Sequence, residues 1–266
     1  MAVQISDLFH RTPAKRIFAG QCPVHGEVDK SEVEQLDGSM LARGCKRCQW
    51  ESLHMAPRDG EAYALAKAQA LAERTTAALI GAGITPRFAE ATFDGYVTES
   101  DQQRNALAKC RDYAEQFPTH FRAGRSLLLT GNVGCGKTHL ASAIVRTLVA
   151  DRCRALIIPA SDIISIARAS MVPNSGYTDR DVVLHLGGLD LLAIDEVGCQ
   201  KGSEYELGLL HAIIDRRYQA VLPTVLISNL GVDGLRSYIG DRALDRLRQN
   251  GGMAVGFTWS SMRAAA

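Results

Sequence analysis

An eight-residue run at 131–138 combines the residue types that hold a phosphate chain. It is GNVGCGKT, which fits the pattern G-x-x-x-x-G-K-[ST] throughout. Glycines let the backbone wrap a phosphate, with amide hydrogens pointing inward at the start of a helix. Lys137 would reach the β- and γ-phosphates, and the Thr138 hydroxyl would take a position on Mg²⁺. The run follows an apolar stretch and precedes a helical pattern, as a phosphate-binding loop requires.

We expect this run and the residue after it to contact ATP: Gly131, Asn132, Val133, Gly134, Cys135, Gly136, Lys137, Thr138 and His139. Cys135 occupies a variable position of the pattern, so we interpret it as a small filler and not as a nucleophile. His139 is expected to face outward from the first helical turn. A chance glycine-rich turn is the alternative interpretation, and the flanking strand and helix argue against it.

Asp195 and Glu196 end the apolar run LDLLAIDE at 189–196. In a hydrolytic site, Asp195 would hold Mg²⁺ through water, and Glu196 would orient or activate the attacking water. Acidic residues are common at strand ends, so the catalytic interpretation depends on the preceding phosphate loop. Asn229 ends another run, TVLISN, where its side chain could reach the γ-phosphate or the water; a turn residue is the open alternative.

Apolar runs alternate with helical patterns from residue 84 onward. Continuous apolar strands separated by helices predict a parallel sheet covered on both faces. The runs are 126–130, 155–158, 191–194, 224–228 and 253–259, with a turn-rich insertion at 171–179. The predicted fold class is therefore α/β, with a five-stranded parallel sheet flanked by helices over residues 84–266.

A Cys-x-x-His pair, Cys22 and His25, precedes a Cys-x-x-Cys pair, Cys45 and Cys48. Each pair would straddle a tight turn, and the four side chains make a tetrahedral zinc set. The segment between the pairs alternates apolar positions and contains Asp-Gly at 37–38, which favours a hairpin and a zinc-ribbon-like module over 1–55. Unliganded thiols are the alternative, but a segment so poor in large apolar residues needs a bound metal to stabilise its fold.

An alanine-rich helix is predicted between this module and the ATPase, within a linker at 56–83. Its apolar stripe is expected at Leu65, Ala68, Ala72, Thr75 and Leu79. A redox role for the Cys-x-x-Cys pair is disfavoured because no βαβ unit surrounds it.

The composition excludes several classes of protein. Lys and Arg number 30 against 29 Asp and Glu, so any nucleic-acid binding must come from a local patch. We find neither a secretory signal nor an apolar run of membrane-spanning length. Seven cysteines with one C-x-x-C fit a cytoplasmic protein with a metal site better than a disulfide framework. The apolar fraction of 46% is enough for a sizeable core.

Residues 84–263 resemble the DnaC-type replicative helicase loaders, a branch of the AAA+ ATPases shared with IstB-like transposition helpers. The resemblance is carried, in order, by ITPRFAEATFDGY, the phosphate loop, DLLAIDEVGCQ, YELGLLHAIIDRRY, GDRALDRLR and FTWSSMR. It implies that Asn229 is the sensor-1 residue, that Arg246 is an arginine finger completing a neighbouring subunit's ATP site, and that Arg263 is the sensor-2 arginine. GDRALDRLRQ also fits a solvated helix face with charge pairs.

The resemblance further implies a hexameric DnaB-type helicase, single-stranded DNA and a self-assembled spiral or ring as partners, with no membrane. A helical insertion within about 160–186 would touch the DNA. Many loaders grip the helicase with a helical N-terminal region, whereas others carry a zinc module, and this chain is similar to the second kind.

Two other functions stay open from the sequence. One is an IstB-like ATPase that helps a transposase on duplex DNA. The other is an adaptor whose zinc module binds DNA through Lys46, Arg47 and Trp50, with ATP only switching assembly.

Overall fold

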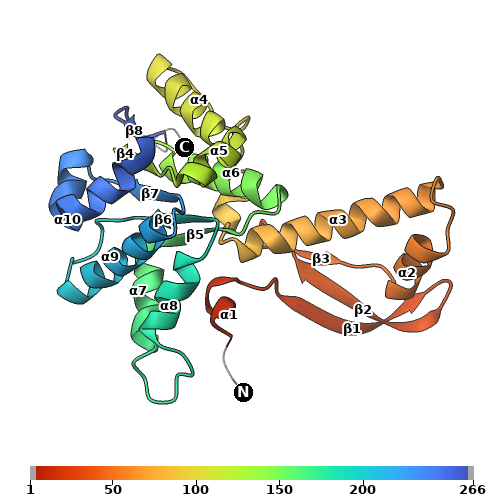
Figure 1. The fold of residues 1–266 in the computed structure, drawn as a ribbon. Coiled ribbons are helices and arrows are strands. Elements are labelled where there is room, and N and C mark those ends of the chain that lie inside the picture. Colours follow the sequence, from red (N-terminus) through yellow and green to blue (C-terminus); the bar gives the residue numbers. More distant parts are fainter. Residues whose placement is uncertain (1–3, 263–266) are drawn as a thin grey trace. The chain divides into compact units, whose positions relative to one another are not determined.

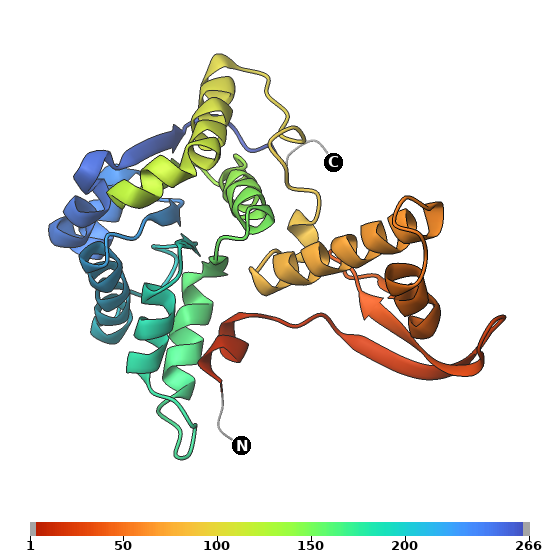
Figure 2. The ribbon, with the colours of Figure 1, turned by 45° about the vertical axis from the view of Figure 1, so that its right-hand side comes forward.

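The computed structural model describes residues 4–262 and divides the chain into two units (Figures 1 and 2). One unit is formed by residues 10–89. The other joins residues 4–9 to residues 90–262.

The unit of residues 10–89 contains a three-stranded antiparallel sheet. β1 (Lys15–Cys22) pairs with β2 (Gly26–Glu34), which pairs with β3 (Met40–Ala42). The turn between β2 and β3 contains Gly38 at φ 86°, a conformation that glycine adopts without steric cost. The hairpin predicted from the Asp-Gly pair is therefore confirmed.

Two helices complete this unit, α2 (Lys46–His54) and α3 (Glu61–Gly81), followed by a 3₁₀ turn, η1 (Pro86–Phe88). The apolar stripe predicted for α3 is wrong except at Leu79. Ala66, Leu79 and Ile80 are buried, whereas Leu65 is 59% exposed.

The error in the α3 stripe has a physical cause. Alanines lie all round this helix, so its periodic signal is weak. A polar contact also marks one side of the helix, because Glu73 forms an ion pair with Arg43.

The larger unit is built on a parallel sheet in the order β5-β6-β7-β4-β8. The strands are β4 (Leu127–Gly131), β5 (Ala155–Pro159), β6 (Leu191–Asp195), β7 (Thr224–Ser228) and β8 (Met253–Phe257). β6 and β7 are buried at every position, as strands covered on both faces must be. The predicted five-stranded α/β fold is confirmed.

The helices of this unit connect and cover the strands. They are α1 (Ile5–Phe9), α4 (Asp101–Glu115), α5 (Phe117–Ala123), α6 (Lys137–Ala150), α7 (Ala160–Ala169), α8 (Asp179–Gly187), α9 (Glu204–Gln219), α10 (Val232–Arg248) and the 3₁₀ turn η2 (Gln249–Gly251).

The strand order assigns the helices to faces. The connection from β4 to β5 runs along the strand order in one direction. The connections from β5 to β6, from β6 to β7 and from β7 to β8 run in the opposite direction. Because such crossovers are right-handed, α6 covers one face and α7 to α10 cover the opposite face.

Helices α7 and α8 form the predicted insertion. They run side by side, and the loop at 170–178 projects away from the sheet in both views (Figures 1 and 2). Thr178 caps α8 by accepting a hydrogen bond from the Asp181 amide, and its own amide donates to the Asp181 carboxylate. Phe9 of α1 stacks on the His185 ring of α8 at 5.1 Å between centroids.

One arginine is completely buried in this unit. Arg217 of α9 donates to the carbonyls of Leu186, Leu189 and Pro223 and to the Thr224 hydroxyl. Each acceptor lies near the end of α8 or the start of β7. The guanidinium therefore holds the amino end of β7, the central strand of the sheet, close to the end of α8.

Candidate functional site

The phosphate-binding loop joins β4 to α6 and depends on glycine at three positions. Gly131, Gly134 and Gly136 have φ values of 123°, 79° and 86°. A Cβ at Gly131 would lie 2.3 Å from the Phe257 carbonyl oxygen, and one at Gly136 would lie 2.4 Å from the Tyr96 ring. The loop therefore requires glycine for its backbone conformation and for its close neighbours.

Lys137 begins α6 and is buried against the loop that precedes it. Its ammonium donates to the carbonyls of Gly131 and Asn132 at 2.8 and 2.5 Å. The Phe257 ring centroid lies 6.0 Å from Nζ. These contacts hold the cation at the loop that would receive the phosphates.

Thr138 and Asp195 meet at the carboxyl edge of the sheet, where the Thr138 hydroxyl hydrogen-bonds the Asp195 carboxyl. Burial raises the pKa of Asp195, while this bond, the Glu196 amide and the charge of Lys137 oppose the rise. A buried carboxyl beside a hydroxyl is the oxygen set that Mg²⁺ prefers. Thr138 and Asp195 therefore fit the expected Mg²⁺ position.

Glu196 follows β6 with an unusual backbone. Its φ is 58°, a left-handed conformation that costs energy for a residue with a side chain. Its amide donates to Asp195 Oδ1 at 2.7 Å, and its side chain is exposed. The turn thus presents the Glu196 carboxylate to solvent next to the buried Asp195.

Asn229 follows β7, the strand between β6 and β4. Its side chain is exposed, and Nδ2 donates to Cys199 Sγ at 3.8 Å. Because parallel strands end at the same edge, Asn229 lies between the acidic pair and the phosphate-binding loop. Asn229 was expected from the resemblance to be the sensor-1 residue, and it lies at the same edge of the sheet as the phosphate-binding loop.

The C-terminal segment 257–262 lies along the phosphate-binding loop, a contact that the sequence analysis missed. The Asn132 amide donates to the Phe257 carbonyl, and the Met262 amide donates to the Gly134 carbonyl. Asn132 Nδ2 also donates to the carbonyl of Trp259. These contacts join residues more than a hundred positions apart, and no local pattern in the sequence indicates them.

Cys135 anchors the same segment. It is fully buried, and its thiol donates to the Trp259 carbonyl at 2.9 Å. Burial raises the pKa of this thiol, which favours the neutral donor over a thiolate. This environment agrees with the interpretation of Cys135 as a filler.

Tyr96 also contacts the phosphate-binding loop, and it was not among the site residues expected from the sequence. Its hydroxyl donates to the Cys135 carbonyl at 2.9 Å. His139 does not face outward as expected, because its half-buried ring lies against Tyr96 and its Nε2 hydrogen-bonds the Thr92 carbonyl at 2.8 Å. The segment FDGY, singled out by the resemblance, was the signal for Tyr96.

Arg246 lies on α10 and is held within its own chain. It forms an ion pair with Asp215 of α9, and its guanidinium lies 5.5 Å from the Tyr218 ring centroid. Gly240, at φ 80°, breaks α10 between its first half and the half that carries Arg246. Arg263 lies outside the described residues.

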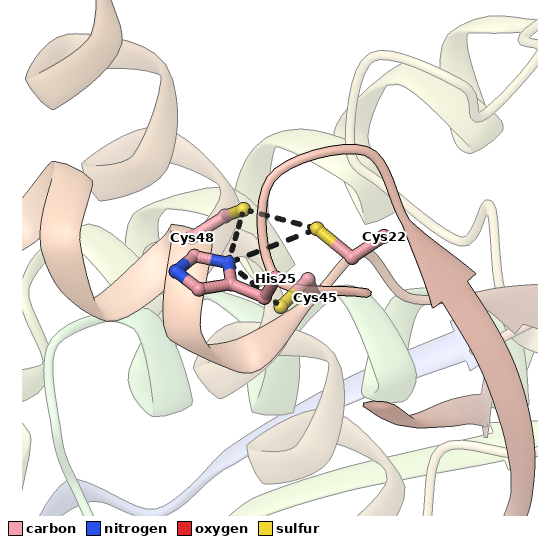
Figure 3. A group of neighbouring side chains, drawn as sticks. All are labelled: Cys22, His25, Cys45 and Cys48. Atoms are coloured by element: carbon pink, nitrogen blue, oxygen red, sulfur yellow. Dashed lines mark hydrogen bonds between the residues drawn. The ribbon is translucent and has the colours of Figure 1, made fainter. Parts of the chain in front are cut away.

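The Cys-His cluster lies in the other unit, residues 10–89. Cys22 ends β1, and His25 lies in the turn before β2 (Figure 3). Cys45 is the residue before α2, and Cys48 is in its first turn, so the second pair lies at a helix start and not in the expected tight turn. The backbone amides of Val24 and His25 lower the pKa of Cys22 to about 6, whereas the hydrogen bond with Cys22 and burial raise the pKa of Cys48 to about 11. The thiolate is therefore favoured at Cys22, and zinc would have to displace a proton from Cys48.

The distances within this cluster fit a tetrahedral ion. The three sulfurs of Cys22, Cys45 and Cys48 lie 3.7, 3.6 and 3.3 Å from His25 Nδ1. Zinc bonds of about 2.0–2.3 Å at the tetrahedral angle place neighbouring ligand atoms about 3.5–3.8 Å apart. The four residues therefore suit zinc.

The phosphate-loop unit has clear relatives. The family model of IstB-like ATP-binding proteins matches residues 98–250, more than half of the chain. The chain belongs to the family of IstB-like ATP-binding proteins. Its larger unit is thus an ATP-binding domain, and the Cys-His cluster lies outside the range that the family model matches.

Relatives of this chain with curated names include replicative helicase loaders. The replicative helicase loader DnaC of Escherichia coli strain K12 is 36% identical over 182 residues, 68% of this chain and 73% of that protein. The replicative helicase loader DnaC of Buchnera aphidicola from Acyrthosiphon pisum is 34% identical over 181 residues, 68% of this chain and 72% of that protein. The resemblance to DnaC-type loaders is confirmed.

A solved structure shows the same fold. A crystal structure of the DnaC helicase loader superimposes with a TM-score of 0.57 at 22% identity, over 64% of this chain and 98% of that chain. The larger unit therefore has the fold of that helicase loader. None of the described helices is long and apolar enough to span a bilayer.

Proposed function

We propose that this chain is an ATP-hydrolysing loader that places a hexameric, DnaB-type replicative helicase on single-stranded DNA when replication begins. The observation that carries the proposal is the 36% identity to a replicative helicase loader over 182 residues. The phosphate-binding loop, the Asp195–Glu196 pair and Asn229 lie at the carboxyl ends of the adjacent strands β4, β6 and β7, which is consistent with ATP chemistry at this edge.

In this proposal the chain's own residues divide the work at the phosphates. The loop amides and Lys137 bind the β- and γ-phosphates. Thr138 and Asp195 hold Mg²⁺, which would neutralise charge on the phosphate oxygens. The exposed Glu196 carboxylate orients the attacking water and takes its proton, and Asn229 fixes the water or the γ-phosphate.

Arg246 and Arg263 complete the proposed ATP site. Arg246 of one subunit reaches the γ-phosphate bound by the next, so that hydrolysis depends on assembly into a spiral or ring. Its contact with Asp215 would have to open first. Arg263 acts as the sensor-2 arginine; the segment that precedes it, 257–262, runs along the phosphate-binding loop.

Each part of the chain has its own role in this proposal. Helices α7 and α8, within the insertion at about 160–186, touch single-stranded DNA. Residues 1–55 hold zinc and select the helicase. Residues 56–83 form the linker to the ATPase domain, and residues 84–266 make up that domain, which hydrolyses ATP.

The test uses the full chain, the hexameric helicase of its own host, ATP and single-stranded DNA. We expect a complex on gel filtration and stimulated loading of the helicase. Lys137→Ala should lose nucleotide binding. Glu196→Gln should bind ATP but hydrolyse it about 10²–10⁴-fold more slowly, the usual contribution of a general base. If the wild-type chain forms no complex and does not stimulate loading, the proposal is wrong.

A second candidate is an ATPase that helps a DNA transposase, which the IstB-like family match favours. Assembly of the Glu196→Gln variant on long duplex DNA, with no preference for single strands, would support it over the helicase loader.

A further inference from the structure

We infer that Glu51 is a positioning residue of the zinc site, which orients His25 so that the imidazole binds the metal through Nδ1. No role was expected for Glu51 from the sequence. The inference depends on the Cys-His cluster and not on the proposed loader function.

The two nitrogens of the His25 ring have different neighbours. The sulfurs of Cys22, Cys45 and Cys48 surround Nδ1, at 3.3–3.7 Å (Figure 3). Nε2 points away from the sulfurs and lies 2.9 Å from Glu51 Oε1. A nitrogen bound to metal carries no proton, so the neutral ring must be protonated at Nε2, and this N–H donates to the carboxylate.

Helix α2 places Glu51 for this contact. Cys48 and Glu51 are three residues apart, so they lie on the same side of the helix. The helix therefore carries a ligand and the carboxylate that holds another ligand, while His25 arrives from the β1–β2 turn. The pattern C-x-x-C-x-x-E is the signal in the sequence that would have indicated Glu51.

Burial explains why the ring needs this partner. The His25 side chain is only 11% exposed, whereas Glu51 is 42% exposed. Because the ring is buried, its outer N–H needs an acceptor from the protein, and the Glu51 carboxylate supplies it. A carboxylate on the outer nitrogen fixes the tautomer and orientation and makes Nδ1 more basic.

An ordinary surface ion pair is the competing explanation for the contact. A pair of that kind contributes little to stability, and its loss would leave metal affinity unchanged. A positioning carboxylate has a different signature, because its loss lowers metal affinity by about 10–100-fold.

The experiment measures zinc affinity of the full chain by competition with a chromophoric chelator. We expect Glu51→Ala to weaken zinc binding about 10–100-fold. Glu51→Gln keeps an oxygen acceptor without the charge and should recover part of this loss. Glu61→Ala is the matched control, because Glu61 is an exposed carboxylate in the same unit, at the start of α3; it should match the wild type.

Nitrogen-15 NMR of the His25 imidazole gives a second measurement on the zinc-loaded chain. We expect Nε2 to be protonated and Nδ1 to have the shift of a metal-bound nitrogen. Circular dichroism of each zinc-loaded variant separates lost affinity from lost folding. The inference is overturned if zinc is bound through Nε2, if well-folded Glu51→Ala binds zinc within about twofold of the wild type, or if the wild-type chain binds no zinc.

Discussion

Asn132 in the phosphate-binding loop donates a hydrogen bond from Nδ2 to the carbonyl oxygen of Trp259, at 3.1 Å. The same amide group lies 3.1 Å from the Thr258 carbonyl. The indole of Trp259 packs 4.9 Å from the Phe257 ring, which in turn lies near Lys137. We therefore expect a change of the loop on binding a phosphate chain to alter the surroundings of the aromatic residues in the C-terminal segment.

Tryptophan fluorescence should report ATP binding at this contact. The chain has two tryptophans, Trp50 and Trp259, so Trp50→Phe leaves one emitter beside the phosphate-binding loop. We expect ATP with Mg²⁺ to change the emission of this variant, because the loop and the indole share hydrogen-bonded backbone. In Trp50→Phe with Lys137→Ala the change should vanish. An unchanged emission, with ATP binding shown by calorimetry, would contradict the coupling.

Gly131→Ala should damage the loop without touching any catalytic side chain. The new Cβ would meet the Phe257 carbonyl oxygen at 2.3 Å, and the residue would have to keep φ near 123°. This backbone conformation alone costs a residue with a side chain about 1–3 kcal/mol. We expect a lower melting temperature and ATP binding weakened by tenfold or more, a loss of about 1.4 kcal/mol.

Gly208→Ala is the control for that change. Gly208 lies inside α9 with open space where a Cβ would lie, so alanine should stabilise the helix by up to about 1 kcal/mol. Equal effects of the two substitutions would show that the contact at Gly131 is unimportant.

Arg217→Met should strongly destabilise the larger unit. The substitution leaves buried carbonyls of Leu186, Leu189 and Pro223 without their donor. Because a buried unsatisfied group costs about 1–3 kcal/mol, we expect a loss of about 3 kcal/mol or more in urea denaturation. Arg216→Met removes an exposed arginine next to it and should stay within about 0.5 kcal/mol of the wild type.

Asp215→Asn distinguishes a catalytic from a structural Arg246. If Arg246 acts on a neighbour's nucleotide, Asp215 competes with that nucleotide, so Asp215→Asn should keep or raise assembly-dependent ATP turnover. Arg246→Ala should lower turnover about 10³-fold or more, the contribution of an arginine finger. Both changes break the same ion pair and should lower the melting temperature similarly. If the two variants lose turnover equally, Arg246 has a structural role and does not act on a neighbour's nucleotide.

Much of the fold follows from local patterns in the sequence. Strands such as β6 and β7 are buried on both faces, so their inner positions, 191–194 and 225–227, are all apolar and each strand is visible as a continuous run. The phosphate-binding loop is equally local, because its glycines, Lys137 and Thr138 lie within eight residues. The Cys-His pairs identified the cluster because ligand types and spacing determine which ion can bind.

Contacts between distant segments could not be predicted in this way. Nothing in the sequence near Trp259 indicates that its carbonyl accepts from Asn132 and Cys135, since those contacts depend on β8 pairing beside β4. Likewise, the environment of Arg246 is set by the packing of α10 on α9, which a charge pattern on one helix does not determine.

The backbone of Glu196 has a consequence for how this protein could be engineered. A side chain at φ 58° costs about 1–2 kcal/mol that glycine would avoid, so Glu196→Gly should raise the melting temperature, while loss of the proposed general base should slow hydrolysis about 10²–10⁴-fold. A melting curve of this variant checks the expected stabilisation, and an ATPase assay checks the expected loss of hydrolysis. Selection for thermal robustness alone would therefore favour inactive proteins at this position, and any laboratory evolution of the chain must retain a screen for turnover.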